Sequence, residues 1–186
     1  MEKEKRYEEY AYVLDYLQHG RPGARPSYRA GALIQVIGEE FFTLLEATVR
    51  ESLVLKPYDR VYVGKESREQ VTYIMGRISF DELTSTAKLE LPTAIEKIIL
   101  NREQWFINFF NTAQAITPRM HALELIPGIG KKYMWQIINE RERVPFKSFD
   151  DLQQRANIPS PPKLVTKRIL EELSEESKYR LFTRVP

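Results

Sequence analysis

Residues 123–141, LELIPGIGKKYMWQIINER, constrain the fold of this chain more than any other stretch. Apolar residues at helical spacing lie on both sides of a Pro-Gly-Ile-Gly sequence at 127–130. Proline and glycine end a helix, and Lys131 follows at once as the start of another. The spacing therefore predicts two helices joined by a tight turn. We expect the first of them to begin at Pro118, with Thr117 as its N-cap.

This turn has the composition of an anion-binding site. Glycine-containing turns direct successive backbone N–H groups toward one point, which favours anions. The helix that follows adds unpaired N–H groups and the positive end of its dipole, and two lysines add full charges. Such a site holds phosphate without reading a base. Close helix packing is the alternative use of the glycines. The candidate binding residues are Gly128, Ile129, Gly130, Lys131 and Lys132.

The first half of the chain has the shorter, period-two pattern of β-strands. Five short segments are expected to be strands: residues 10–17, 32–38, 41–49, 60–64 and 70–79. Their spacing predicts a small antiparallel barrel, because closing the sheet removes exposed edges. The spacing leaves the OB-like and SH3-like barrels open as alternatives. A helix near 92–114, with Pro92 in its first turn, is expected to follow the strands.

These patterns predict an α+β protein in three parts. We expect a five-stranded OB-like or SH3-like β-barrel over 1–90, a connecting helix over 91–114 and an all-α domain over 115–186. The chain up to residue 114 holds 15 Lys/Arg and 17 Asp/Glu, whereas 115–186 holds 13 and 9. The basic excess therefore belongs to the C-terminal part. A polyanionic partner for that part and a random drift of surface charge are the two interpretations, and charge alone leaves both open.

A loop between the first two expected strands is a second candidate contact surface. Residues 19–31, HGRPGARPSYRAG, contain no acid. Arginine guanidinium groups hold phosphates, and a tyrosine ring can stack on a base. The alternative is an exposed loop that arginine keeps soluble. The candidate residues are Arg21, Arg25, Tyr28 and Arg29.

Residues 125–138, LIPGIGKKYMWQII, resemble the helix-hairpin-helix motif of nucleic-acid-binding proteins. Residues 143–158, RVPFKSFDDLQQRANI, resemble the segment that follows this motif, where Ser148 and Asp151 have the spacing of a capping box. The resemblance implies contact with the nucleic-acid backbone through the turn. The residues that match the hairpin are Pro127, Gly128, Ile129, Gly130 and Lys132.

Residues 156–173, ANIPSPPKLVTKRILEEL, come where a second helix-hairpin-helix unit would lie. Its turn contains no glycine, and proline has no N–H to offer a phosphate. We therefore expect a structural copy of the first unit, with Lys163, Lys167 and Arg168 as peripheral contacts.

The whole chain resembles an uncharacterised archaeal family, domain-of-unknown-function family 655, whose members are predicted to bind RNA or nucleotides. The resemblance implies a barrel followed by a double helix-hairpin-helix domain and a role in information processing. The resemblance supplies no established activity.

Several classes of function are disfavoured. The chain has no cysteine, which removes disulfides, thiolate metal ligands and a cysteine nucleophile. His19 and His121 lack metal-ligand spacing. The start of the chain is charged, unlike a signal peptide, and the longest uncharged run is too short and polar to cross a membrane. Asp150 and Asp151 suit a helix start better than catalysis.

We therefore expect a cytoplasmic, non-catalytic nucleic-acid-binding protein without cofactor, metal or membrane contact. RNA is favoured over DNA as its partner. A protein-interaction adaptor or scaffold, with protein partners, is the main alternative. A nuclease or a DNA glycosylase is the second.

Overall fold

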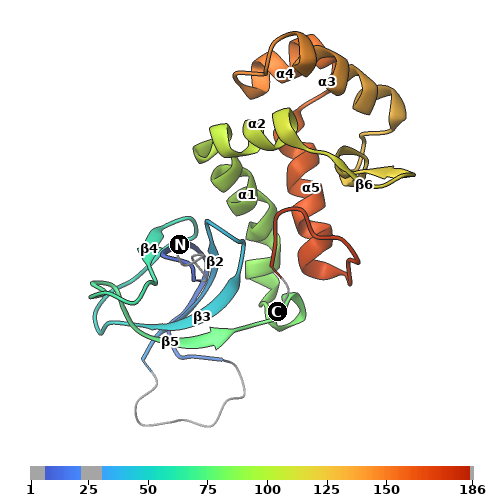
Figure 1. Cartoon of the computed structure of the whole chain (residues 1–186). Coiled ribbons are helices and arrows are strands. Elements are labelled where there is room, and N and C mark those ends of the chain that lie inside the picture. The colour runs from blue at the N-terminus through green and yellow to red at the C-terminus, as the bar shows by residue number, and fades with distance from the viewer. Residues whose placement is uncertain (1–6, 22–30, 185–186) are drawn as a thin grey trace. The chain divides into compact units, whose positions relative to one another are not determined.

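The computed structural model describes residues 7–21 and 31–184, which form a mixed α+β structure (Figure 1). The described chain divides into two compact units. One contains the residues up to Ala94 together with those from Leu173 onward, and the other is Ile95–Glu172. The C-terminal segment thus groups with the β-rich unit, whereas the sequence led us to expect 115–186 as one domain.

The β-rich unit is built on a curled, five-stranded antiparallel sheet in the order β4-β1-β2-β3-β5. The five expected segments contain its strands. The two end strands do not pair with each other, so the expected closed barrel is an open half-barrel in the described chain. The strands are β1 (Tyr10–Leu17), β2 (Leu33–Gly38), β3 (Leu44–Val49), β4 (Arg60–Tyr62) and β5 (Val71–Arg77).

The curled sheet packs its strands around an apolar cluster of buried side chains. Alternate residues of β1, β2 and β3 belong to it, as the period of two requires, whereas β4 and β5 contribute one buried valine each. Every residue of β2 is buried, because this central strand is covered on both faces. The cluster comprises Ala11, Val13, Ile34, Val36, Ala47, Val49, Leu55, Val61, Val63 and Val71.

Two helices replace the single one expected over 92–114. After a short 3-10 turn η1 (Phe80–Glu82), α1 spans Ser85–Asn101 and α2 spans Glu103–Thr112. The Thr84 hydroxyl caps α1 by accepting from Ala87 N at 3.0 Å, so the helix begins well before Pro92. Pro92 is therefore interior but exposed. The chain breaks between the helices at Arg102, where φ is −116° and ψ is 33°.

The helix expected to begin at Pro118 is absent. Its place is taken by a two-stranded hairpin, β6 (Ala115–Thr117) and β7 (Met120–His121), followed by a 3-10 turn, η2 (Ala122–Leu125). The residue before a proline is sterically biased away from helix, and Thr117 is also β-branched. Thr117 is consequently no N-cap, and its hydroxyl instead accepts from Arg119 N at 3.3 Å within the hairpin turn.

The remaining helices are α3 (Lys131–Arg143), α4 (Phe149–Ala156) and α5 (Pro161–Ser174). Ser148 caps α4 by accepting from Asp151 N at 3.0 Å. Arg155 of α4 donates to the carbonyl oxygens of Glu140 and Val144 at 2.7 and 2.6 Å, which closes the C-terminal end of α3. These hydrogen bonds stabilise the C-terminal end of α3, the helix whose first turn follows the Pro-Gly turn. In the described chain, no helix combines the length and the apolar character that a membrane crossing requires.

Candidate nucleic-acid interface

The turn before α3 is set by a proline and a glycine. Ile129 N donates to Ile126 O at 3.0 Å across Pro127 and Gly128. Gly128 has φ +89°, so proline and a positive-φ glycine hold the two central positions, as in a type II turn. The Ile126 and Ile129 side chains are buried on either side of it. The apolar core thus anchors the turn while its tip is exposed.

Gly130, by contrast, is required neither by its backbone nor by its packing. It is the N-cap of α3 with φ −87° and ψ −171°, which any residue adopts. A Cβ at this position would meet no atom of another described segment within 4 Å. The start of α3 is therefore open to solvent at the point where a ligand could approach the backbone.

The open end of α3 presents amide donors that make no hydrogen bond to any residue described by the structure. Met134 N to Gly130 O, at 2.9 Å, is the bond that begins the helix. The amides of Lys131, Lys132 and Tyr133 precede it, and the first amides of a helix have no acceptor within that helix. The positive end of the helix dipole coincides with them. An anion placed here would meet N–H groups and two exposed lysines.

The two lysines differ, which the sequence did not reveal. Lys131 Nζ donates to Glu124 Oε1 at 2.8 Å, and the same carboxylate accepts from His121 N at 2.9 Å. The Lys131 contact, followed by the His121 amide, lowers the pKa of Glu124 below its usual value. Within the described residues, Lys132 makes no side-chain hydrogen bond or ion pair. Lys132 is therefore the more available of these two lysines.

His121 caps η2 and is not a metal ligand candidate. Its Nδ1 accepts from Leu123 N at 3.1 Å, which requires this nitrogen to be unprotonated. Burial, assisted by the charge of Arg141, lowers the pKa of His121. In the part of the chain that the structure describes, no group of three His, Asp or Glu side chains could hold a metal ion.

The second hairpin has no comparable donors. Helix α5 begins with Pro161 and Pro162, which have no N–H. The next two amides, of Lys163 and Leu164, already donate to Ser160 O at 3.0 and 3.4 Å. A pocket of about 330 Å³ beside this turn is lined by Lys163 but also by carboxylates. This end of α5 is therefore unsuited to phosphate. The carboxylates are those of Glu96, Glu103 and Asp150.

Arg168 was expected to be a peripheral contact and is a buried structural residue. Its Nε donates to Glu172 Oε2 at 3.1 Å, and its Nη1 donates to Leu125 O at 3.3 Å. It is 8% exposed. Arg168 thus ties α5 to the end of η2, just before the Pro-Gly turn.

Arg21, the candidate of the arginine-rich loop that the structure describes, is already paired. Its guanidinium lies 2.7 Å from Glu46 Oε2 in β3, and Glu46 also accepts from Gln35 Nε2 at 2.9 Å. Arg21 was expected to be a phosphate contact, and in the structure an acid distant in sequence is its partner. The other loop candidates, Arg25, Tyr28 and Arg29, lie outside the described residues.

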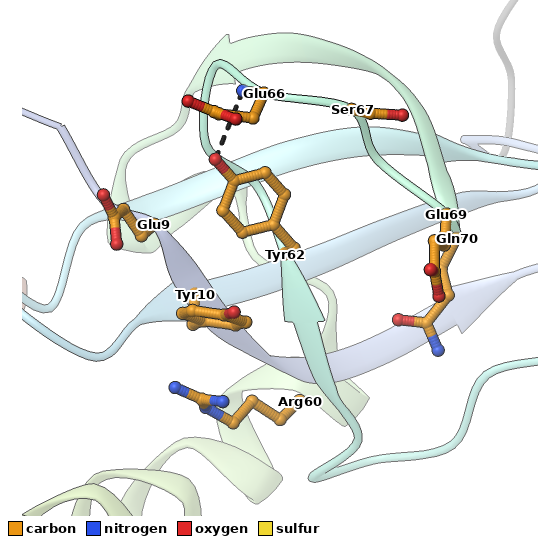
Figure 2. A pocket seen from close by; sticks show the side chains of 8 residues that line it. All are labelled: Glu9, Tyr10, Arg60, Tyr62, Glu66, Ser67, Glu69 and Gln70. Atoms are coloured by element: carbon orange, nitrogen blue, oxygen red, sulfur yellow. Dashed lines mark hydrogen bonds between the residues drawn. The ribbon is translucent and has the colours of Figure 1, made fainter.

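The β-rich unit contains a pocket that the sequence did not indicate (Figure 2). Arg60 lies 3.6 Å from the centre of the Tyr10 ring, and Tyr10 makes an edge contact with Tyr62 at 5.3 Å. Arg60 is itself paired with Glu39 at 2.7 Å. The pocket measures about 570 Å³, and its composition suits a cation better than a phosphate. Its carboxylate-bearing residues are Glu9, Glu66 and Glu69.

The fold and the α3 site define a two-unit α+β protein with an exposed, lysine-bearing helix start. Residues 7–184 match the family model described as "Protein of unknown function (DUF655)", and the chain belongs to this family. The uncharacterised protein MJ0038 of Methanocaldococcus jannaschii is 39% identical over 184 residues, which cover 98% of this chain and 82% of that protein. The crystal structure of Af1531 from Archaeoglobus fulgidus, assigned to the same family, has a TM-score of 0.89 and 48% identity, over 95% of this chain and all of that one.

Proposed function

We propose that this chain is a non-catalytic nucleic-acid-binding protein that grips the phosphate backbone through the turn before α3. RNA is its favoured partner over DNA. The observation that carries the proposal is the open start of α3, where an unobstructed Gly130, unpaired helix amides and the available Lys132 coincide. Backbone contacts of this kind hold a strand without reading its bases.

The arrangement of the helical unit supports a double helix-hairpin-helix assignment. The first hairpin would be η2, the Pro-Gly turn and α3, and the second would be α4, the proline turn and α5. The first helix of the first hairpin is only a four-residue 3-10 turn. On this assignment the first hairpin binds phosphate, whereas the second is a structural copy.

The strand order of the β-rich unit supports the OB-like alternative over the SH3-like one. Pairing of β1 with β4 and of β3 with β5 gives the strand neighbours expected of that fold, which is a partly open five-stranded barrel. OB-folds bind oligonucleotides through the loops between strands 1 and 2 and between strands 4 and 5. The first of these loops carries Arg25, Tyr28 and Arg29. We therefore retain this loop as a second contact surface.

A salt series tests the proposal. Single-stranded RNA, single-stranded DNA of the same sequence, duplex RNA and duplex DNA are titrated at several salt concentrations. We expect Lys132→Ala to weaken all four about equally and to reduce the salt slope by about one. Lys131→Ala is the matched control, with a smaller effect because Glu124 already offsets its charge. A salt-independent affinity, or an unchanged slope in Lys132→Ala, would contradict the proposal.

The pocket of Figure 2 favours one second candidate, a protein-interaction adaptor. Tyrosine rings beside exposed carboxylates suit the lysine or arginine side chain of a basic segment. An arginine-rich peptide should bind the chain, and Glu69→Gln and Tyr62→Ala should each weaken it. A peptide that binds both variants like the wild type would remove this candidate.

A further inference from the structure

The exposed face of α3 contains a tryptophan next to the proposed phosphate site. Trp135 is 55% exposed. Its ring makes no aromatic or cation–π contact with the described residues. The other tryptophan, Trp105 of α2, is 46% exposed but lies 4.9 Å from the Phe106 ring and 5.0 Å from the Arg102 guanidinium. Trp135 is therefore the tryptophan with an unoccupied ring.

Helical spacing brings this ring to the two lysines. Trp135 is three residues after Lys132 and four after Lys131, so the three side chains are neighbours on one face. The opposite face is formed by Met134 and Ile137, which are buried in the core. Long side chains in helices lean toward the N-terminus, so the Trp135 ring covers the surface above the first turn. An exposed aromatic side chain thus shares one face of α3 with the two lysines of its first turn.

The charge around Trp135 determines what can occupy its face. A single exposed apolar residue needs no partner, and an isolated tryptophan would carry no inference. Here the neighbouring lysines and the helix dipole favour an anion within reach of the ring. A nucleotide supplies an anion for the lysines and a flat ring for the tryptophan, because its phosphate and its base belong to the same unit. Bases inside a regular duplex are stacked on each other, whereas unpaired bases can stack on aromatic side chains.

We propose that Trp135 stacks on an unpaired base whose backbone phosphate lies at the start of α3, so that the ligand is single-stranded or locally unpaired nucleic acid. This inference rests on the proposed function and names the structural class of its partner. The Lys132 contact holds any strand, and Trp135 adds affinity only where a base is free.

The test compares a uridine-rich single-stranded RNA with a fully paired RNA duplex, using the full chain. Trp135→Ala should weaken the single strand by about fivefold or more, the lower end of the stacking range, and should leave the duplex nearly unchanged. The salt slope should not change, because no charge is removed. Trp135→Phe should recover part of the affinity, which a loss of folding would not allow.

Fluorescence provides a second readout, since the chain has two tryptophans. In Trp105→Phe, the remaining Trp135 emission should be quenched by the single strand and not by the duplex. In Trp135→Phe, the remaining Trp105 emission should stay constant.

The inference is overturned if Trp135→Ala binds the single strand like the wild type, or if it weakens both ligands equally. With either result, Lys132→Ala can still reduce the dependence of affinity on salt concentration. The proposed function then stands, and only the stacking role of Trp135 fails. Absence of binding to any nucleic acid, or quenching of Trp135 by an acidic peptide in place of RNA, overturns both.

Discussion

Gly128 and Gly130 lie two residues apart but are glycines for different reasons. Gly128 has φ +89°, and an added Cβ would lie 3.1 Å from Leu164 Cδ2. Gly130 has an ordinary backbone conformation and open space around it. The first glycine is therefore needed by the turn, whereas the second leaves room for a ligand.

Gly130→Ala should separate binding from folding. The substitution places alanine at an N-cap, which costs at most about 1 kcal/mol of stability. We expect phosphate affinity to fall by about tenfold, because the methyl group obstructs a charge-assisted hydrogen bond to the helix amides. Gly128→Ala is the control, with a loss of about 1–2 kcal/mol from its positive φ. Thermal unfolding and RNA affinity are measured for both variants. A folded Gly130→Ala variant that binds RNA normally would argue against a phosphate at this position.

The short element η2 depends on a neutral histidine. His121 Nδ1 accepts from Leu123 N, and the pKa of His121 is lowered by burial and by Arg141. The folded protein therefore takes up this proton at a lower pH than the unfolded chain, for which the usual value is about 6.5. The stabilising contribution is complete above about pH 6.5 and is lost as the pH falls through the folded-state pKa.

His121→Asn should weaken this pH dependence, because asparagine accepts the same hydrogen bond without titrating. Urea unfolding at pH 7.5 and at pH 5.5 gives the loss of unfolding free energy between the two pH values. This loss should be smaller in the variant than in the wild type. An equal loss of stability in both proteins over this range would show that His121 does not contribute.

The two helix starts, of α3 and α5, form an internal comparison. The α3 start has free amides, whereas the α5 start has two prolines and two amides occupied by Ser160 O. We therefore expect Lys163→Ala to cost less binding than Lys132→Ala, with both variants equally stable. Affinity for a common single-stranded RNA measures this, and an equal or larger loss in Lys163→Ala would show that the second hairpin also binds phosphate.

At the scale of the whole molecule, charge differs between the two units. Ile95–Glu172 has 12 Lys/Arg and 9 Asp/Glu, whereas the remainder of the chain has 16 and 17. The helical unit therefore has the stronger attraction for a polyanion. Contacts from the β-rich unit depend on local chemistry and not on its net charge.

Two residues of the arginine-rich loop should behave differently. Arg21→Ala leaves Glu46, which is 4% exposed, without its cation, and should cost about 1–2 kcal/mol of stability with little change in affinity. Tyr28→Ala should lower single-strand affinity by about 1–3 kcal/mol and leave stability unchanged. Chemical unfolding and RNA titration measure the two effects. Unchanged RNA affinity in Tyr28→Ala would remove the tyrosine from the contact surface.

The sequence by itself determined the features that arise from neighbours along the chain. The period-two strands, the Pro-Gly turn, the Ser148 cap and the core face of α3 each depend on residues within a few positions. Local sterics and hydrogen bonding set such elements. The resemblance of the whole chain to domain-of-unknown-function family 655 is confirmed.

Only the tertiary structure decided which of the candidate charges are available. Arg21 pairs with Glu46 and Arg168 donates to Leu125 O, partners 25 and 43 residues away in sequence. Glu124 forms an ion pair with Lys131 and not with Lys132, although the two lysines are adjacent and chemically equal. The strand order and the open edge of the sheet likewise arise from long-range pairing. Whether a charged side chain has a partner depends on which groups the fold brings within a few ångströms of it. Those groups are often distant in sequence, so neighbouring residues along the chain do not predict them.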